Sequence, residues 1–298
     1  MARTTFEELL DAGVHFGHLR RKWNPNMAPY IFMERNGIHI IDLYKTMAKL
    51  EEAASALKQI AKSGRKVLFV ATKKQAKEIV ATQVQKVAMP YVVERWPGGM
   101  LTNFATIRKA VRKMGSIDKL MSTSNFKSLS KRERLQINRE RQKLEKQLGS
   151  IAELNRLPSA IFVVDILKEK IAIAEARKLN IPTFAIVDTN SDPNIIDFPI
   201  PGNDDASKSI ELILRILVQA IEEGLAERKI DKEARGEDDE RDEFDQPILM
   251  VDVLDDEEDT EAIRKKAAEK LAKVKKEEED RMADTNKRPR RSLSKTRK

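Results

Sequence analysis

The chain contains no cysteine, and aromatic residues make up only 5% of its 298 positions. Without cysteine it can form neither disulfide bonds nor thiolate metal sites. The few aromatic residues mean that any core must be built mainly from aliphatic side chains. Long apolar runs and the charged-then-apolar pattern of a secretory signal are also missing. We therefore expect a cytoplasmic protein with no membrane partner.

Glycine-rich phosphate loops are missing as well. Neither G-x-G-x-x-G nor G-x-x-x-x-G-K-[ST] occurs in the chain. After the apolar run 67–71, the turn reads Thr72-Lys73-Lys74-Gln75, with no glycine that would let the backbone approach a pyrophosphate. The sequence therefore argues against a catalytic nucleotide site, and we expect no small-molecule substrate.

Charge is abundant and unevenly distributed. Charged residues make up 35% of the chain, and the net charge of +8 combines +12 in residues 1–230, −13 in 231–261 and +9 in 262–298. A basic body indicates a polyanionic partner, most often nucleic acid. Residues 231–298 are so polar, apart from the apolar stretch 248–254, that we predict a charged, disordered carboxyl-terminal extension.

Alternating strand and helix patterns occupy the first 230 residues. The runs 67–71, 160–164 and 183–187 are short and continuously apolar, which is typical of parallel strands buried on both faces. The pattern predicts an α/β fold, a three-layer parallel-sheet domain of the Rossmann or flavodoxin-like kind. Helices are expected at 5–13, 45–63, 73–88, 168–179 and 204–227, strands at 38–43, 91–94 and 198–200, and an irregular segment at 15–36.

An inserted helical hairpin is predicted at 104–156. Apolar residues at Phe104, Ile107, Val111 and Met114 are spaced by three, four and three, as in a short coiled-coil seam. A second helix is expected from Lys131 to about residue 154, roughly 36 Å at 1.5 Å per residue. Between residues 127 and 146 there are eight Lys or Arg and three acids. A rigid basic arm of this kind suits a protein that lies among RNA and other proteins.

Cationic, polar and aromatic residues gather near the expected strand ends and on the arm. Lys and Arg neutralise phosphates, and Trp or Arg planes stack on unpaired bases. Any one of them is more often a solvated charge, but together they favour RNA binding. The candidates are His18, Arg20, Arg21, Lys22, Trp23, Arg35, Lys73, Lys74, Arg95, Trp96, Asn103 and Arg108, with Lys131, Arg132, Arg134 and Arg139 on the arm.

Four aspartates follow the last two expected strands. Asp188, Asp192, Asp204 and Asp205 should lie at the carboxyl edge of the sheet, where α/β proteins usually bind ligands. No cofactor is required, but Asp188 and Asp205 are candidate ligands for Mg or Zn. In the favoured alternative, Asp204 and Asp205 cap the last helix and the other two shape turns.

Two histidines, His15 and His18, are three residues apart and could share a metal. They lack a further ligand at a suitable local spacing, so we favour polar residues of a packed or RNA-facing loop. His39 alternates with apolar residues in an expected strand and is interpreted as structural.

Three long segments carry a resemblance to a known family. GVHFGHLRRKWNPNMAPYIF (13–32), RWPGGMLTNFATIR (95–108) and FAIVDTNSDPNIIDFPIPGNDDA (184–206) resemble bacterial small-ribosomal-subunit protein two, of the universal S-two family. The resemblance covers about residues 1–228. It implies a non-catalytic α/β protein with a protruding coiled-coil hairpin, which contacts 16S ribosomal RNA near the head–body junction.

The resemblance also implies partners among neighbouring small-subunit proteins, including S-one, the large messenger-binding protein anchored by this family in many bacteria. The extension 231–298 is longer than the family leads us to expect. The alternative function is a soluble α/β metal-dependent enzyme that uses Asp188 and Asp205.

Overall fold

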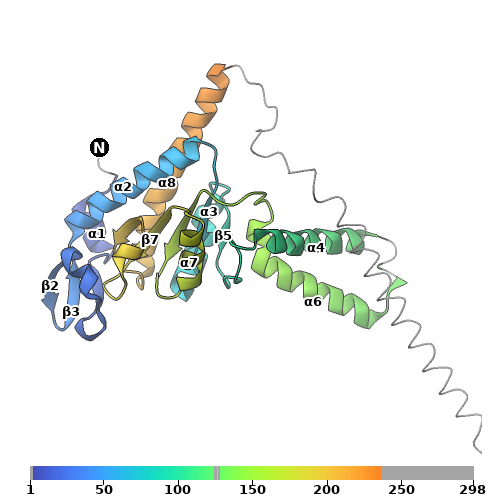
Figure 1. Cartoon of the computed structure of the whole chain (residues 1–298), viewed down its shortest axis with the longest axis horizontal. Helices are drawn as coiled ribbons and strands as arrows, with labels where there is room; N and C mark the ends of the chain where they lie inside the picture. The colour runs from blue at the N-terminus through green and yellow to red at the C-terminus, as the bar shows by residue number, and fades with distance from the viewer. Residues whose placement is uncertain (1–2, 124–125, 127, 236–298) are drawn as a thin grey trace, which may run out of the picture. The chain divides into compact units, whose positions relative to one another are not determined.

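The computed structural model describes residues 3–123, 126 and 128–235 (Figure 1). The elements are α1 (Phe6–Asp11), β1 (Phe16–Leu19), η1 (Arg20–Lys22), η2 (Pro25–Tyr30), β2 (Ile31–Arg35), β3 (Ile38–Ile41), α2 (Leu43–Lys62), β4 (Val67–Val70), α3 (Lys74–Gln85), β5 (Tyr91–Val92), α4 (Phe104–Ser122), α6 (Lys131–Leu148), η3 (Gly149–Ile151), β6 (Ala160–Val164), α7 (Lys170–Lys178), β7 (Thr183–Val187), η4 (Pro193–Ile195), β8 (Phe198–Pro201) and α8 (Ser207–Arg235).

The main sheet has five parallel strands in the order β5-β4-β6-β7-β8. Side chains alternate across it, as strand geometry requires. Phe162 and Phe184 face one buried cluster with α2, α3 and α8, whereas Ile161 and Val163 face a second cluster with α7. Both faces are covered, so the predicted three-layer α/β fold is confirmed.

Helices α2 and α8 lie side by side over one face of the main sheet (Figure 1). The backbones approach closely at Gly224, where an added Cβ would lie 2.4 Å from the carbonyl oxygen of Lys58. Lys58 also pairs with Glu227 at 2.7 Å. Only glycine permits this approach, so the helix pair depends on the residue at 224.

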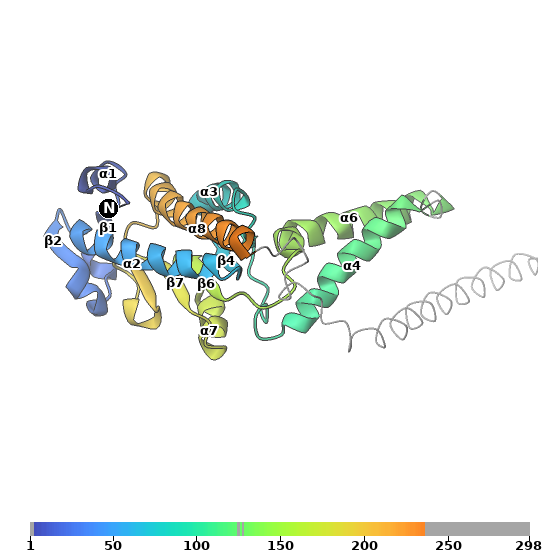
Figure 2. The ribbon, with the colours of Figure 1, turned by 90° about the horizontal axis from the view of Figure 1, so that it is seen from above.

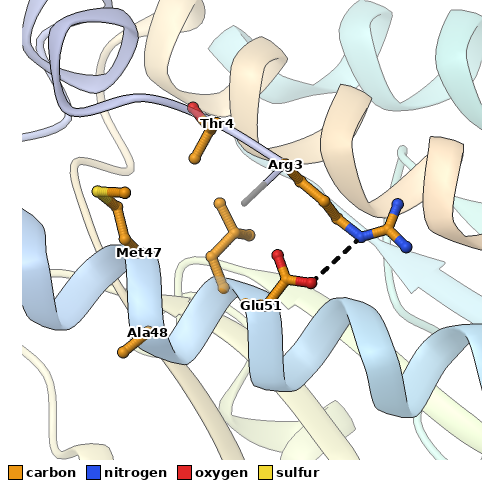
Figure 3. A pocket seen from close by; sticks show the side chains of 6 residues that line it. Arg3, Thr4, Met47, Ala48 and Glu51 are labelled. Carbon is orange, nitrogen blue, oxygen red and sulfur yellow. Dashed lines mark ion pairs between the residues drawn. The ribbon is translucent and has the colours of Figure 1, made fainter. Parts of the chain in front are cut away.

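The amino-terminal segment is fastened to α2 and α8. Arg3 donates to both carboxylate oxygens of Glu223 at 2.7 Å and lies 3.6 Å from Glu51. Under it lies a hollow of about 230 Å³, lined by Thr4 and by Met47, Ala48 and Leu50 of α2 (Figure 3). The charges at its rim are ion-paired, so the hollow offers no free charge to a ligand.

A second, antiparallel sheet in the order β1-β3-β2 occupies the segment expected to be irregular. The prediction for 15–36 was therefore wrong, since β1, β2, η1 and η2 all lie there. Both strand pairings have register shifts, at Phe16–Leu19 and Ile31–Met33. These irregularities break the two-residue alternation that would have indicated a strand.

The arm consists of α4 and α6, which run side by side (Figure 2). Its inner seam places Ile107, Val111 and Leu144 against the second cluster of the main sheet. Farther out, Lys113 pairs with Glu140. That the pair forms a coiled coil stays a prediction, and loop residues 124–125 fall outside the described residues.

Most predicted boundaries differ from the structure by a few residues, and those of α6 and α8 are the most informative. Helix α6 ends at Leu148 instead of near 154, because Gly149 begins a 3-10 turn. Its 18 residues span about 27 Å. Helix α8 begins at Ser207 instead of 204 and continues to Arg235, beyond the expected boundary at 231. Just before it, the Asn203 side chain, and not Asp204 or Asp205, accepts hydrogen bonds from the amides of residues 205 and 206.

The rest of the predicted extension, 236–298 with its apolar stretch 248–254, lies outside the described residues. Among the helices that the structure describes, none has the length and apolarity needed to span a bilayer.

Candidate nucleic-acid interface and carboxylate cluster

The carboxyl ends of the main-sheet strands bring charged residues together. Lys73 follows β4, Asp165 follows β6, Asp188 follows β7, and Asp204 and Asp205 follow β8. The Lys73 ammonium lies 2.9 Å from Asp204, 2.6 Å from Asp205 and 3.6 Å from Asp165. One cation thus faces several carboxylates, and the local charge is negative.

Asp192 does not join this group. Its side chain accepts a hydrogen bond from the Asn194 amide at 3.0 Å and shapes the turn at Pro193, as the favoured alternative expects for this residue.

His18 reaches the same edge from the second sheet. Its backbone N–H donates to Thr189 Oγ1 at 2.8 Å, its Nδ1 lies 2.9 Å from Asp188 Oδ2, and its Nε2 lies 3.4 Å from Asp205 Oδ2. A Cβ at Gly17 would lie 2.6 Å from the Thr189 methyl carbon, so glycine permits this contact. The sequence did not link His18 to the aspartates, which are about 170 positions away.

Burial controls the electrostatics of the cluster. Asp188 and Asp204 are each only 1% exposed. Burial, and then the nearby charge of Asp188, raise the pKa of Asp204 to about 7. Burial by itself would raise the pKa of Asp205, but the hydrogen bond and charge of Lys73, together with the charges of His18 and Lys22, keep that pKa below its ordinary value.

The Asp188 hydrogen bond outweighs burial and raises the pKa of His18. The Oδ2 atom of Asp204 is buried and has no hydrogen-bond partner within the described part of the chain. Lys73 and His18 therefore leave at least one acceptor of the cluster unsatisfied.

A cationic turn directly follows β1 in the second sheet. Arg20, Arg21 and Lys22 form η1 and are exposed, and Trp23 lies with its ring centre 5.2 Å from that of His39. Arg20 also pairs with Glu34 at 3.2 Å, and Arg35 ends β2 on the exposed side.

A second cationic stretch is the root loop, residues 95–103, which connects β5 with α4. Arg95 and Asn103 are exposed, and Arg108 on α4 donates to Asn155 at 2.9 Å. Trp96 is only 7% exposed, and its Nε1 donates to Glu175 at 3.1 Å. Its burial argues against stacking on an RNA base and favours support of the loop from inside.

The remaining candidates lie on α3 and the arm. Lys74 is exposed at the first turn of α3, and Lys131, Arg132 and Arg139 are exposed on α6, where Arg134 is partly buried. Lys73 instead points inward to the carboxylates. The sixteen candidates therefore fall on the second sheet, the sheet edge and the arm with its root, rather than in one pocket.

Comparison with known proteins decides the family. The model of the family described as Ribosomal protein S2 matches residues 9–224, most of this chain. The chain belongs to the ribosomal protein S2 family. It resembles the protein named "Small ribosomal subunit protein uS2" of Phocaeicola vulgatus, with 70% identity over 240 residues, 80% of this chain and 86% of the relative.

Two further relatives carry the same name. The Bacteroides thetaiotaomicron protein is 69% identical over the same shares of both chains, and the Porphyromonas gingivalis protein is 67% identical over 78% of this chain and 83% of the relative. The S-two resemblance is thus confirmed. The chain is a structural protein of the small ribosomal subunit, acting in translation, and the alternative of a metal-dependent enzyme is wrong.

Proposed function

We propose that this ribosomal protein binds 16S ribosomal RNA near the head–body junction, in the cytoplasm, chiefly by neutralising phosphates. The observation that carries the proposal is the exposed turn Arg20–Lys22, whose backbone is fixed at both ends. The Arg20 amide donates to Gly37 at 2.9 Å, and the Asn24 amide donates to Thr189 at 2.8 Å. A turn anchored in this way orders its cations before RNA arrives, which lowers the entropy lost on binding.

The remaining exposed cations extend this surface. Lys74, Arg95 and the arm residues Lys131, Arg132 and Arg139 offer charges at separate places rather than one base-reading pocket. Phosphate contacts position a protein on its RNA and carry little sequence information. We therefore propose that the shape of the protein surface, and not contacts to base edges, selects the RNA segment.

The test is the salt dependence of binding of the full chain to 16S ribosomal RNA. In the variant R20A/R21A, the slope of log affinity against log salt should fall by roughly 1.5, at about 0.7–0.9 for each phosphate that is no longer neutralised. The control K208A/R215A removes two exposed charges from α8 and should keep the wild-type slope. Equal slopes for the two variants would show that the turn makes no phosphate contacts.

We also propose that the protein helps to hold neighbouring small-subunit proteins, S-one among them. Support comes from large apolar side chains left exposed on β2 and α2: Phe32 and Tyr44 are each 72% exposed and Met33 is 49% exposed. Large apolar side chains left exposed are available for contacts with other proteins. Mass spectrometry of subunits carrying F32S/Y44S should show less S-one, whereas the control I171S should not. An unchanged inventory would refute this surface.

A divalent cation at the carboxylate cluster is a further proposal. His18, Asp188, Asp204 and Asp205 offer ligand atoms that all lie within 4.8 Å of one another. The Asp204 oxygen without a hydrogen-bond partner supports it. One imidazole nitrogen with three carboxylates suits Zn²⁺ better than Mg²⁺, which prefers six oxygens including waters. This set adds His18 and Asp204 to the two aspartates predicted from the sequence.

Elemental analysis of the full chain after dialysis against zinc and then metal-free buffer tests this site. Wild type should retain about one zinc per chain, and D204N should retain much less. The control D192N changes a neighbouring aspartate that shapes a turn, and it should retain zinc normally. Equal retention by D204N and wild type would refute the site.

A further inference from the structure

Glu175, on α7, is a buried carboxylate enclosed by donors from the root loop. It is 7% exposed. Its Oε1 accepts from Trp96 Nε1 at 3.1 Å and from the Gly99 amide at 2.8 Å. Its Oε2 accepts from the Leu101 amide at 2.9 Å and from the amide and hydroxyl of Thr102 at 3.2 and 3.3 Å. Five donors from one loop therefore converge on one side chain.

The root loop has little other backbone support. Between β5 and α4 it forms turns only, and inside it the Met100 amide donates to Pro97 at 3.1 Å and the Asn103 amide to Gly99 at 2.8 Å. Three more amides are satisfied by Glu175 alone. Buried amides without partners are unfavourable, so the carboxylate decides which conformation of the loop is stable.

The carboxylate is ionised under ordinary conditions. Burial by itself would raise the pKa of Glu175, but the hydrogen bonds from Trp96, Leu101, Gly99 and Thr102 outweigh it and hold this pKa below its usual value. No Lys or Arg donates to Glu175 in the described residues. Its charge is therefore stabilised by neutral donors, and this requires the loop to stay closed around it.

The root loop carries groups proposed above to meet RNA. Exposed Arg95 directly precedes Trp96, and exposed Asn103 directly follows Thr102 and begins α4. Figure 2 shows α7 next to the loop that leads into α4. The placement of Arg95 and of the first turn of the arm thus depends on the residues that Glu175 holds.

We infer that Glu175 is a positioning residue for RNA binding, which holds residues 96–102 in the conformation that places Arg95 and the root of the arm against RNA. The inference rests on the proposed RNA-binding function. It concerns a residue of α7 whose side chain is buried among the donors of the root loop.

The decisive variant is E175Q, because charge and positioning predict opposite effects. The substitution adds one to the net charge, which by itself strengthens binding to a polyanion. A glutamine of the same size, however, turns an NH₂ group toward loop donors and loses about half of the accepting capacity. The control E211Q makes the same charge change at an exposed position on α8.

We expect E175Q to bind 16S ribosomal RNA about tenfold more weakly than wild type at fixed salt, a loss comparable to one misplaced specific contact. The E211Q variant should bind as tightly as wild type or slightly more tightly. Binding of E175Q equal to that of E211Q would overturn the inference.

Amide hydrogen exchange of the free, full-length protein provides a second measurement that does not depend on RNA. In E175Q the amides of Gly99, Leu101 and Thr102 should exchange at least about tenfold faster, while amides of β6 stay protected. Unchanged exchange at the three loop amides would also overturn the inference.

The pH profile of wild type requires no variant. Because the pKa of Glu175 is lowered on folding, the loop amides should stay protected down to below the ordinary value of about 4.3 and open as the pH falls through the lower folded value. Opening only together with β6 would contradict the inference.

The two proposals fail differently. Wild type that does not bind RNA in a salt-dependent way refutes the proposed function, even if the loop amides loosen in E175Q. Wild type that binds RNA, with an E175Q variant that binds equally well, refutes only the role of Glu175.

Discussion

The body of this protein, residues 3–103 and 149–235, and its arm differ in how they are stabilised. In the body, every residue of β4, β6 and β7 is buried. In the arm, only Ile117 of α4 and Leu148 of α6 are buried. Isolated helices of 18 or 19 residues are only marginally stable in water. The comparison teaches that the body is held by its own core, whereas the arm depends on its root.

The root belongs to the core of the body. Phe104 and Ile107 of α4, together with Leu148, Ile151 and Leu154, pack in the cluster that covers one face of the main sheet. The arm therefore divides into an inner half that covers the sheet and an outer half that does not. The predicted ends of the inserted hairpin, residues 104 and 156, do not coincide with this division between the inner and outer halves.

Removing the whole arm should have the largest effect. Replacing residues 105–155 with a Gly/Ser linker deletes the buried side chains of Leu148, Ile151 and Leu154, and at about 1.5 kcal/mol or more for each the body should lose at least about 4.5 kcal/mol. Replacing only 113–141 should change the free energy of unfolding by less than about 1 kcal/mol. Chemical denaturation measures both. Equal stability of the two deletions would show that the root does not belong to the core.

A matched truncation compares the two regions directly. Phe162 is fully buried in the main sheet, so F162A should lower the free energy of unfolding by about 4 kcal/mol. Leu144 is only partly buried on the arm, and L144A should lower it by about 1 kcal/mol. Urea titrations followed by circular dichroism give both values. A larger loss for L144A would reverse the comparison.

Two glycines in helices provide a test with opposite signs. In G224A the new Cβ would meet the carbonyl oxygen of Lys58 at 2.4 Å, so the body should lose about 2 kcal/mol. In G115A, on α4, the Cβ would meet nothing within 4 Å, and the better helix propensity of alanine should raise stability by up to about 1 kcal/mol. Thermal melts show whether the two shifts have opposite signs, and shifts of the same sign would contradict the difference in packing.

Ion pairs should have the smallest effects. The Arg3 side chain is 17% exposed and pairs with Glu223 through two hydrogen bonds, so R3A should lower stability by about 1 kcal/mol. On the arm, Arg141 pairs with Asp118 and Glu145, which are both exposed to water, and R141A should leave the melting midpoint unchanged at moderate salt. A larger loss for R141A would mean that ion pairs order the outer arm.

The Arg3 pair should also depend on pH. The hydrogen bond from Arg3 lowers the pKa of Glu223 on folding. The contribution of this ion pair to stability is therefore present above the unfolded pKa of about 4.3 and is lost as the pH falls through the lower folded pKa. The stability difference between wild type and R3A should shrink in acid. A difference that stays constant down to pH 2 would exclude this linkage.

Local patterns predicted much of the fold. The continuous apolar runs predicted the strands 160–164 and 183–187 to the residue, and the helix expected at 5–13 begins with a capping box of Thr5 and Glu8. In the second sheet only β3 was expected; β1 and β2 were missed, because they are short and shifted in register. A strand can be predicted from the sequence where its apolar pattern is regular. Where a bulge breaks that pattern, the strand is stabilised only by its pairing with a neighbouring strand, which the sequence does not show.

The candidate site was predicted in part. Asp188 and Asp205 were expected at the carboxyl edge of the sheet, and the structure places them there together with His18 and Asp204. Glu175 was missed altogether. A single glutamate on an amphipathic helix has the same local pattern whether water or the root loop solvates it, so no signal in the sequence marks it.

The sequence by itself determined the class of fold, the segregation of charge and the three segments typical of the family, because these are properties of neighbouring residues. Only the tertiary structure decided which charges are buried. His18 meets Asp188, and Trp96 meets Glu175, across 170 and 79 positions of chain. A buried charge is stable only where distant elements bring it a partner, and that partner is chosen by packing rather than by local spacing.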